Sequence, residues 1–251
     1  MDMVLSDLLD ALSPRAAAAR PVEVCIGVHW TLVTVELEGQ LLGGLASTLS
    51  AGSHDHTGGP GVRDAGRLLS RSVADLAGLV GSDRTLEVGV GMATINALLD
   101  VDEGACVEVN AADIVAERGA GRTVVVVGHF PFVSDLRAVA GTLHVLELAP
   151  RAGDLPAEAA PDVLPSADVV AITGTSLLNG TFGSLMALCR PDAYVLLLGA
   201  TTPLSPILFR AGVTALSGTQ VVDPGAVRAA VLQGATFRQI PGKRLLTMLR
   251  S

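Results

Sequence analysis

A histidine and two carboxylates follow apolar segments in the second half of the chain. His129 comes directly after Gly128 at the end of one segment, Glu147 ends the next, and Asp154 lies a few residues beyond it. Together they make a mixed nitrogen and oxygen donor set of the kind that holds a divalent transition-metal ion. An imidazole also moves protons near neutral pH, so His129 is a catalytic candidate as a general acid or base.

Two of these residues have a structural alternative that the sequence leaves open. His129 can simply cap the edge of a sheet. Asp154 can cap a turn or a helix ahead of Leu155 and Pro156, since Asp commonly fills that role.

Hydroxyl side chains gather in the segment TGTSLLNGT, residues 173–181. If a helix begins within it, free backbone N–H groups and the Thr175 and Ser176 hydroxyls would attract a phosphate or carboxylate. Asn179 would then lie in the first helical turn. The same residues also make an ordinary helix cap. Asn96, a polar residue in an apolar helix, is expected to face the other domain. The ligand-binding candidates are Gly128, Thr173, Thr175, Ser176, Asn179, Thr202 and Asn96.

Several common cofactor motifs are missing. The first strand of the second half carries neither GxGxxG nor GxxxxGK[ST], which disfavours a nicotinamide dinucleotide or a P-loop nucleotide. Cys25, Cys106 and Cys189 lack CxxC spacing and are expected to be small buried residues in a reducing cytoplasm. The His54-Asp55-His56 cluster lies in a glycine-rich loop, where such residues are more often solvated than metal-bound.

Composition narrows the classes of partner. The formal charge of −8 gives no basic field for nucleic acid or an anionic membrane. The N-terminus carries acids where a signal peptide carries positive charge, so we expect a cytoplasmic protein. Residues 169–189 are uncharged and long enough to cross a bilayer, but their glycines and hydroxyls predict a strand, a polar turn and a helix, with no membrane insertion.

The second half alternates apolar strands with helices, which predicts an α/β fold. Strands so uniformly apolar are typical of a parallel sheet covered on both faces, here a Rossmann-like doubly wound sheet. All carboxyl ends of such strands share one edge, which would gather the candidate residues. The strands are expected at 123–128, 142–148, 167–174, 193–199 and 213–218, and the helices at 132–140, 157–163, 176–189, 204–211 and 224–233.

The first half predicts a smaller α+β domain. A helix over the first dozen residues should close at Pro14, and three short runs at 22–28, 31–37 and 41–47 indicate an antiparallel meander. Helical patterns follow at about 64–80 and 85–99. We place the domain boundary near Asn110, giving domains 1–109 and 110–251 with a connecting helix at 110–118.

Six segments resemble the signature blocks of a family named for heavy-metal chelation. They are GHFPF (128–132), LELAPRAGDLP (146–156), ADVVAITGTSLLNGT (167–181), TTPLSPILF (201–209), IGVHWTLV (26–33) and GMATINALL (91–99). The resemblance implies an enolase N-terminal-like domain joined to a Rossmann-like one, with metal or metal chelate held in the cleft between them. By matching block it carries over His129, Glu147, Asp154, Thr175, Ser176 and Asn179.

This sequence departs from the family pattern at one place and adds one feature. Ala200-Thr201 stands where the family would have Pro-Ser, which leaves the loop polar. The His54-Asp55-His56 loop is not a family block, so the resemblance gives it no metal role.

Three functional hypotheses follow. The first is a protein that binds a divalent transition metal or its chelate. The second is an enzyme for a small anionic metabolite, with His129 as general acid or base and residues 173–181 as an anion cradle. The third is a non-catalytic partner of a metal transport system. A homodimer is the expected assembly on general grounds.

Overall fold

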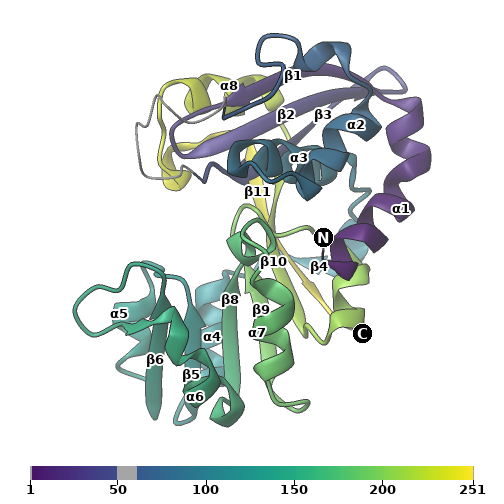
Figure 1. The fold of residues 1–251 in the computed structure, drawn as a ribbon. Helices are drawn as coiled ribbons and strands as arrows, with labels where there is room; N and C mark the ends of the chain where they lie inside the picture. The colour runs from purple at the N-terminus through teal and green to yellow at the C-terminus, as the bar shows by residue number, and fades with distance from the viewer. Residues whose placement is uncertain (1, 50–60, 251) are drawn as a thin grey trace. The chain divides into compact units, whose positions relative to one another are not determined.

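The computed structural model describes residues 2–49 and 61–250. The chain folds into two compact units (Figure 1). The first contains Met1–Val101, Leu177–Asn179 and Thr219–Arg244, and the second contains Asp102–Ser176, Gly180–Gly218 and Leu245–Ser251. The chain therefore passes between the units more than once. The two units are defined by contacts within the folded chain, whereas a domain boundary marks segments that fold independently. The predicted boundary near Asn110 therefore stays a prediction. The His54-Asp55-His56 loop lies outside the described residues.

The first unit is built on the predicted antiparallel meander, which is confirmed. Its strands β1 (Arg20–Ile26), β2 (Trp30–Leu37) and β3 (Gln40–Ser47) pair in sequence order. Glu38 and Gly39 form the tight turn between β2 and β3, both with positive φ, as a two-residue hairpin turn requires. Trp30 begins β2, one residue before the predicted run at 31–37.

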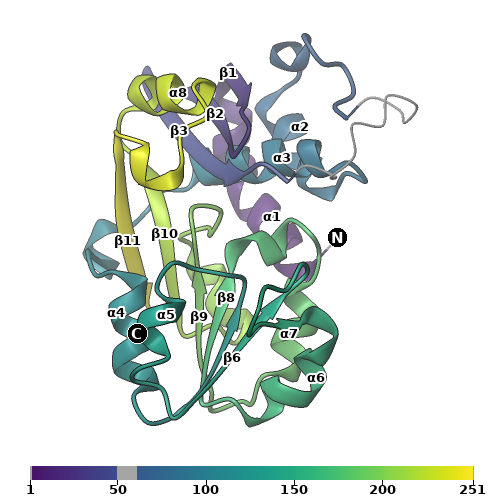
Figure 2. The same cartoon turned by 90° about the vertical axis from the view of Figure 1, so that its left-hand side faces the viewer.

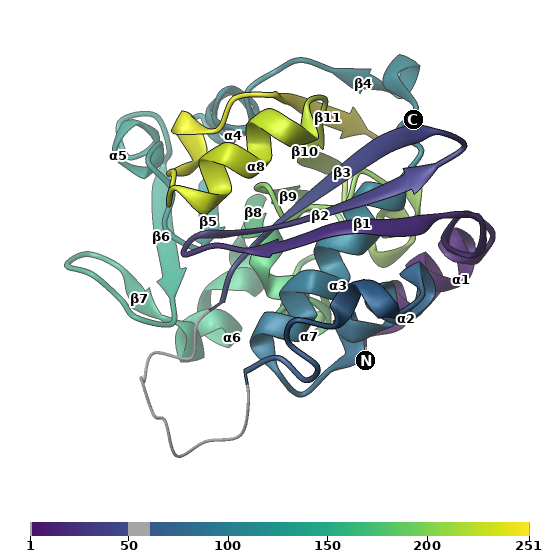
Figure 3. The same ribbon diagram turned by 90° about the horizontal axis from the view of Figure 1, so that it is seen from above.

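Helices cover both faces of this meander, as Figure 3 shows for α3 (Thr85–Leu98) and α8 (Pro224–Leu232). Neighbouring residues of β2 are consequently buried on opposite faces, with Leu32 and Val33 both at 0% exposure. The sequence alone assigns α8 to the end of the parallel domain. In the structure it belongs to the first unit, because Val221 pairs with Gly43 and directs the chain onto the meander.

The first helix, α1 (Met3–Ala18), continues through Pro14, so the prediction that Pro14 ends it is wrong. Proline removes a helical hydrogen bond, but Pro14 lies on the exposed side, where water can solvate the freed carbonyl. Leu12 and Ala16, on either side of it, are buried, and their packing holds the last turn in place.

The single helix expected at about 64–80 is instead several short turns. The structure has η1 (Leu68–Ser70), α2 (Val73–Gly78) and η2 (Leu79–Gly81). Ser72 and Asp75 form a capping box that starts α2 afresh. Before it, Asp64 adopts positive φ and pairs with Arg67 and Arg71, which favours a turn.

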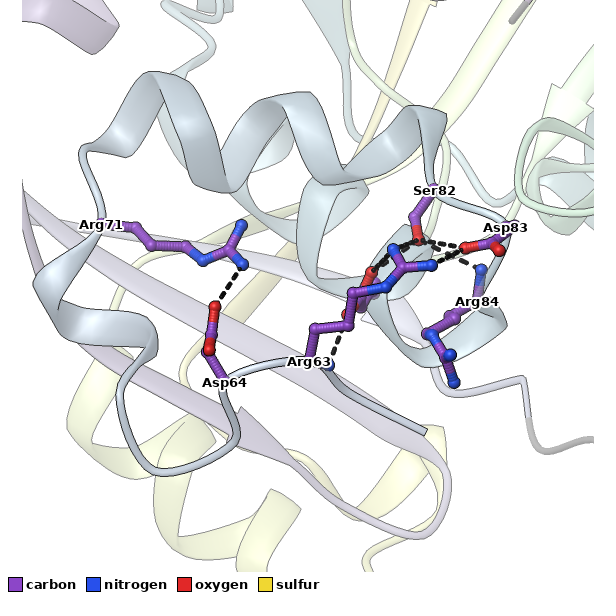
Figure 4. A network of polar contacts seen from close by, with 7 residues as sticks. Arg63, Asp64, Arg71, Ser82, Asp83 and Arg84 are labelled. Carbon is purple, nitrogen blue, oxygen red and sulfur yellow. Dashed lines mark hydrogen bonds and ion pairs between the residues drawn. The ribbon is translucent and has the colours of Figure 1, made fainter. Parts of the chain in front are cut away.

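A polar network fastens this region to the start of α3 (Figure 4). The Glu87 side chain is only 1% exposed, and it is neutralised by Arg63, whose Nη1 lies 3.1 Å from Oε2. The Arg63 backbone N–H and the Ser82 hydroxyl also donate to the Glu87 carboxylate, at 2.5 and 2.6 Å. Arg63 pairs with Asp83 as well. A buried charge is tolerated only when paired in this way.

The second unit is a parallel sheet, which confirms the α/β prediction. Its strands are β5 (Thr123–Val127), β6 (Thr142–Glu147), β7 (Leu155–Pro156), β8 (Val169–Thr173), β9 (Tyr194–Leu198) and β10 (Ala215–Val221). They lie in the order β10-β9-β8-β5-β6-β7, and the pairs from β7 to β10 are all parallel. Counted along the chain without β7, the order is 2-1-3-4-5, one of the two common doubly wound orders.

Helices lie on both sides of this sheet (Figure 2). One side carries α4 (Ala111–Gly119), which confirms a helix at the predicted place while its connecting role stays a prediction, and α5 (Val133–Leu136). The other carries α6 (Ala160–Val163) and α7 (Phe182–Leu188). Most are shorter than predicted. Several turns are 3₁₀: η3 (Glu103–Ala105), η4 (Ala157–Ala159), η5 (Leu164–Ser166), η6 (Gly174–Leu177) and η7 (Pro206–Ala211). A further 3₁₀ turn, η8 (Phe237–Gln239), belongs to the first unit.

The sequence analysis did not predict three strands, namely β7, β4 (Cys106–Val107) and β11 (Lys243–Leu249). Two of them are only two residues long and have no periodicity to read. β11 pairs with β10 and β4. Within the described ranges, no helix has the length and apolar character that a membrane crossing needs.

Gly44 gives a direct test of the packing between β3 and α3. A Cβ there would lie 2.0 Å from the Ala93 carbonyl oxygen and 2.2 Å from the Ala97 nitrogen. Because both are backbone atoms, Gly44→Ala should lower the free energy of unfolding by about 3 kcal/mol or more in urea denaturation. Gly78→Ala is the control. It has helical φ and nothing within 4 Å, so it should be neutral or stabilise by about 0.5 kcal/mol. Equal stability of the two variants would contradict the close approach.

Candidate functional site

The strand order reverses between β5 and β8. The chain leaves β5 toward β6 on one side and leaves β8 toward β9 on the other. In doubly wound sheets, ligands bind beyond the carboxyl ends of the strands at this switch point. Here the two strand ends touch, since a Cβ on Gly128 would lie 3.1 Å from the Thr173 Cβ. Gly128 has φ +101°, so it makes the turn that leads from β5 to His129.

His129 follows this turn, and its side chain is 26% exposed. The loop that carries it is anchored just beyond. Phe130 and Phe132 stack with ring centroids 5.3 Å apart and an interplanar angle of 14°, and both pack against the core of the second unit. The imidazole is thus held on a short, fixed connection instead of a long loop.

His129 and Asp154 form a pair, with 3.1 Å between Nδ1 and Oδ2. Asp154 also closes its own turn, because its Oδ2 accepts the Arg151 backbone N–H and its own N–H donates to the Arg151 carbonyl. Gly153, with φ +89°, allows this turn. Asp154 therefore has both roles: it closes a turn, and it pairs with His129.

The Asp154 side chain is 1% exposed. Its removal from water raises the pKa of the carboxyl, but hydrogen bonds from the Arg151 N–H and His129, with the charges of His129 and Arg137, lower it by more. The resulting pKa is below the ordinary value of 3.8. The second oxygen, Oδ1, is buried and has no hydrogen-bond partner in the part of the chain that the structure describes.

This pairing determines the state of the imidazole. An ionised carboxylate only accepts hydrogen bonds, so Nδ1 of His129 must carry the hydrogen and donate it to Asp154. In the neutral ring, Nε2 then holds the free lone pair. The described residues give Nε2 no partner. His129 consequently presents one nitrogen donor whose orientation is set from behind by a carboxylate.

Glu147 is at the same edge but is not joined to this pair. It ends β6, and its carboxylate accepts the backbone N–H of Leu148. Within residues 2–49 and 61–250, no three His, Cys, Asp or Glu side chains lie close enough to hold a metal ion. The structure therefore does not assemble His129, Glu147 and Asp154 into the expected three-donor set. Strand pairing places Glu147 beside Gly128, and the described contact of its carboxylate is with the Leu148 N–H.

The hydroxyl residues divide into two groups. Thr173 and Thr175 are satisfied by each other, with 3.0 Å between their hydroxyl oxygens. Ser176 and Thr202 are almost fully buried, and within the described ranges neither hydroxyl has a hydrogen-bond partner. The sequence named both residues, but only the structure shows that their hydroxyls are unsatisfied.

The two amide candidates, Asn179 and Asn96, lie in an exposed turn and in a helix of the first unit, respectively. The helix expected from residue 176 begins only at Phe182, because Gly180 adopts φ +73° and breaks the chain direction. Asn179 therefore lies in an exposed turn, outside the first turn of a helix. Asn96 belongs to the first unit, where its Nδ2 donates to the Leu45 carbonyl at 2.9 Å and ties α3 to β3.

The cysteines are not gathered with other possible metal ligands in the described part of the chain. Cys25 is buried as predicted, while Cys106 and Cys189 are only partly buried. Burial raises the pKa of all three thiols, that of Cys189 to about 11. The chemistry available at the sheet edge is that of nitrogen and oxygen donors.

Comparison with known proteins gives a consistent family. A model described as "Putative heavy-metal chelation" (DUF364) matches residues 110–250, and a second with the same description matches residues 9–99. An uncharacterized protein of Methanocaldococcus jannaschii is 25% identical over 224 residues, 86% of this chain and 84% of that protein.

Two crystal structures share the fold, both of DUF364 proteins with unknown function. The one from Desulfitobacterium hafniense has a TM-score of 0.80 at 24% identity, covering 98% of this chain and all of the other. The one from Pyrococcus horikoshii has a TM-score of 0.85 at 19% identity, covering 99% of this chain and all of the other.

The lowered pKa of Asp154 predicts how stability depends on pH. A carboxyl group with a lowered folded-state pKa stabilises the fold above its unfolded pKa, and this contribution is lost as the pH falls through the folded value. In the presence of a metal chelator, wild type should be more stable than Asp154→Asn at pH 7. The difference should shrink as the pH falls below 3.8. Urea unfolding at both pH values measures it, and a constant difference would show that the carboxylate charge is not responsible.

Proposed function

This chain belongs to the DUF364 family, whose model carries the description "Putative heavy-metal chelation", and on that premise we propose that it binds a divalent transition-metal ion, free or chelated. The proposed position is the carboxyl edge of the parallel sheet, at the switch point between β5 and β8. The observation that carries the proposal is the pair of His129 and Asp154, which leaves Nε2 of the imidazole as an oriented donor.

Metal-binding histidines commonly donate their second ring N–H to a carboxylate, which fixes the tautomer and makes the other nitrogen more basic. His129 and Asp154 have that arrangement. In this proposal His129 Nε2 is the ligand and Asp154 is a positioning residue, since its Oδ2 is already occupied on the far side of the ring. Glu147, which ends the neighbouring strand, is a second oxygen donor only if its side chain turns from the Leu148 N–H.

The donor types favour a borderline metal. Imidazole suits nickel, cobalt, copper and zinc, whereas soft metals favour thiolates. No cysteine belongs to a group of three possible metal ligands within the described ranges, which fits this preference for the borderline group.

An enzyme is the second candidate, and the same pair supports it. An imidazole oriented by a buried carboxylate is a common general base, with Nε2 taking the proton. A small anionic metabolite would then be the substrate, held by the hydroxyls of residues 173–181. Stabilisation by an organic anion while a chelator removes metal would favour this candidate, and a thermal-shift screen measures it.

We also propose that the protein is located in the cytoplasm, forms a homodimer and associates with a metal transport system. The net charge of −8 fits a small neutral or cationic ligand.

Calorimetric titration of the metal-free protein with Ni²⁺, Co²⁺, Cu²⁺ and Zn²⁺ tests the metal site. His129→Gln should weaken binding of the preferred metal at least about tenfold, because it removes the nitrogen donor, and Asp154→Asn should weaken it about tenfold by losing the orienting carboxylate. The control is His144→Gln, since His144 is the other described histidine of the second unit and lies within β6. Equal affinity of wild type and His129→Gln would sink the proposal.

A further inference from the structure

Two buried hydroxyls lie just beyond the ends of β8 and β9. Ser176 is 0% exposed and Thr202 is 2% exposed. In the described part of the chain, neither Ser176 Oγ nor Thr202 Oγ1 has a hydrogen-bond partner. A buried hydroxyl without a partner destabilises a protein, so such groups require an explanation.

The Thr202 hydroxyl is directed at the end of β8. A Cβ on Gly174 would lie 2.6 Å from Thr202 Oγ1, so the hydroxyl occupies the space that a side chain at position 174 would need. The Thr202 N–H donates to the Gly199 carbonyl at 3.0 Å, which fixes the turn that carries it. Ser176 follows Gly174 by two residues, within the 3₁₀ turn η6.

These hydroxyls and His129 belong to neighbouring strand ends. Val127 of β5 pairs with Ile172 of β8, and Thr173 pairs with Leu198 of β9. The ends of β5 and β9 are therefore about 10 Å apart, two spacings of roughly 4.8 Å. The switch point lies between them, with His129 on one side and the hydroxyls on the other.

A missing partner alone does not identify a binding site. Thr34, on β2 of the first unit, also has a buried hydroxyl without a partner among the described residues. Ser176 and Thr202 differ from Thr34 in their position, because they lie on consecutive strand ends where this topology receives ligands.

We propose that the Ser176 and Thr202 hydroxyls bind oxygen atoms of a small polycarboxylate chelator, so that the protein takes its metal as a chelate. This inference rests on the metal site proposed above. His129 offers one nitrogen, and the described residues contain no group of three donors. Transition metals take four to six ligands, so most coordination positions stay open to ligands that arrive with the ion, and a chelator can fill several of them at once.

Charge also favours the chelate over a free anion. The Asp154 carboxylate, whose Oδ2 accepts the Arg151 N–H and contacts His129 Nδ1, lies beside the proposed metal position, and its negative charge would repel an uncomplexed polycarboxylate. The metal in a chelate brings compensating positive charge to the His129 side, while the carboxylate oxygens extend toward the hydroxyls, which can donate to them.

Because both hydroxyls are buried, residues 174–181 must move for a chelator to reach them. This segment contains a 3₁₀ turn and Gly180 with φ +73°, and α7 starts only at Phe182. Chelate binding should therefore change amide hydrogen exchange in 174–181, an effect that ligation at His129 alone does not require.

The test compares Ni²⁺ alone, citrate alone and Ni²⁺ in excess citrate, by calorimetry on the full chain. Ni²⁺–citrate should bind wild type, and the double variant Ser176→Ala, Thr202→Val should bind it about tenfold more weakly or worse. Binding of Ni²⁺ alone should not change in this variant. Removing unpartnered buried hydroxyls should preserve or raise Tm, which shows that the variant is folded.

Thr34→Val is the matched control, since it removes the same kind of hydroxyl elsewhere and should leave both affinities unchanged. The inference is overturned, with the metal site intact, if excess citrate strips Ni²⁺ from the protein or if the double variant binds Ni²⁺–citrate as tightly as wild type. If neither form of nickel binds wild type more tightly than His129→Gln, the metal site itself fails. Binding of citrate alone at equal strength would overturn the role assigned to the metal.

Discussion

The second unit depends on one topological constraint, the parallel pairing of β5 with both β6 and β8. This arrangement makes β5 the place where the chain changes direction across the sheet. It brings the ends of β5 and β8 so close that a Cβ at position 128 would lie 3.1 Å from the Thr173 Cβ, and the φ of +101° there also favours glycine. The same glycine turns the chain and presents His129 at the edge. The position of the imidazole is thus a consequence of strand order.

The pairing of His129 with Asp154 places a buried negative charge at this edge and fixes the tautomer of the imidazole. A turn closed by the Asp154 carboxylate sets that side chain behind the imidazole, and the same hydrogen bonds lower its pKa. One buried group therefore holds a loop, keeps a negative charge and selects the tautomer of the histidine. An arrangement with so many linked roles tolerates little substitution, since losing the carboxylate affects the loop and the ring together.

The first unit follows a different rule, that of close backbone contact. Gly44 on β3 lies against the backbone of α3, and Gly91 on α3 lies against Val80. With α8 on the opposite face, the meander is buried from both sides, which explains why Thr31, Thr34 and their apolar neighbours on β2 are all inaccessible to water. The charged exception, Glu87, is held by Arg63 and Ser82.

The sequence by itself determined the α/β class, the three-stranded meander, the parallel strands and the residues that gather at their carboxyl ends. These features follow from local periodicity and from the geometry of parallel sheets, because uniformly apolar strands indicate a parallel sheet. Short elements such as β7 and η6 could not be predicted from the sequence, because two to four residues are too few to show a periodic spacing of apolar positions. The prediction that the first helix ends at Pro14 was wrong, because the burial of Leu12 and Ala16 outweighs the low helix propensity of proline.

Only the tertiary structure decided which candidates meet. It joined His129 to Asp154, separated Glu147 from both, gave Asn96 to β3, and left the hydroxyls of Ser176 and Thr202 without partners. It also placed α8 on the meander, through a pairing between Val221 and Gly43. The physical reason is that a sequence pattern fixes the strand end at which a residue lies, while side-chain direction and long-range pairing depend on the packing of segments distant in the chain.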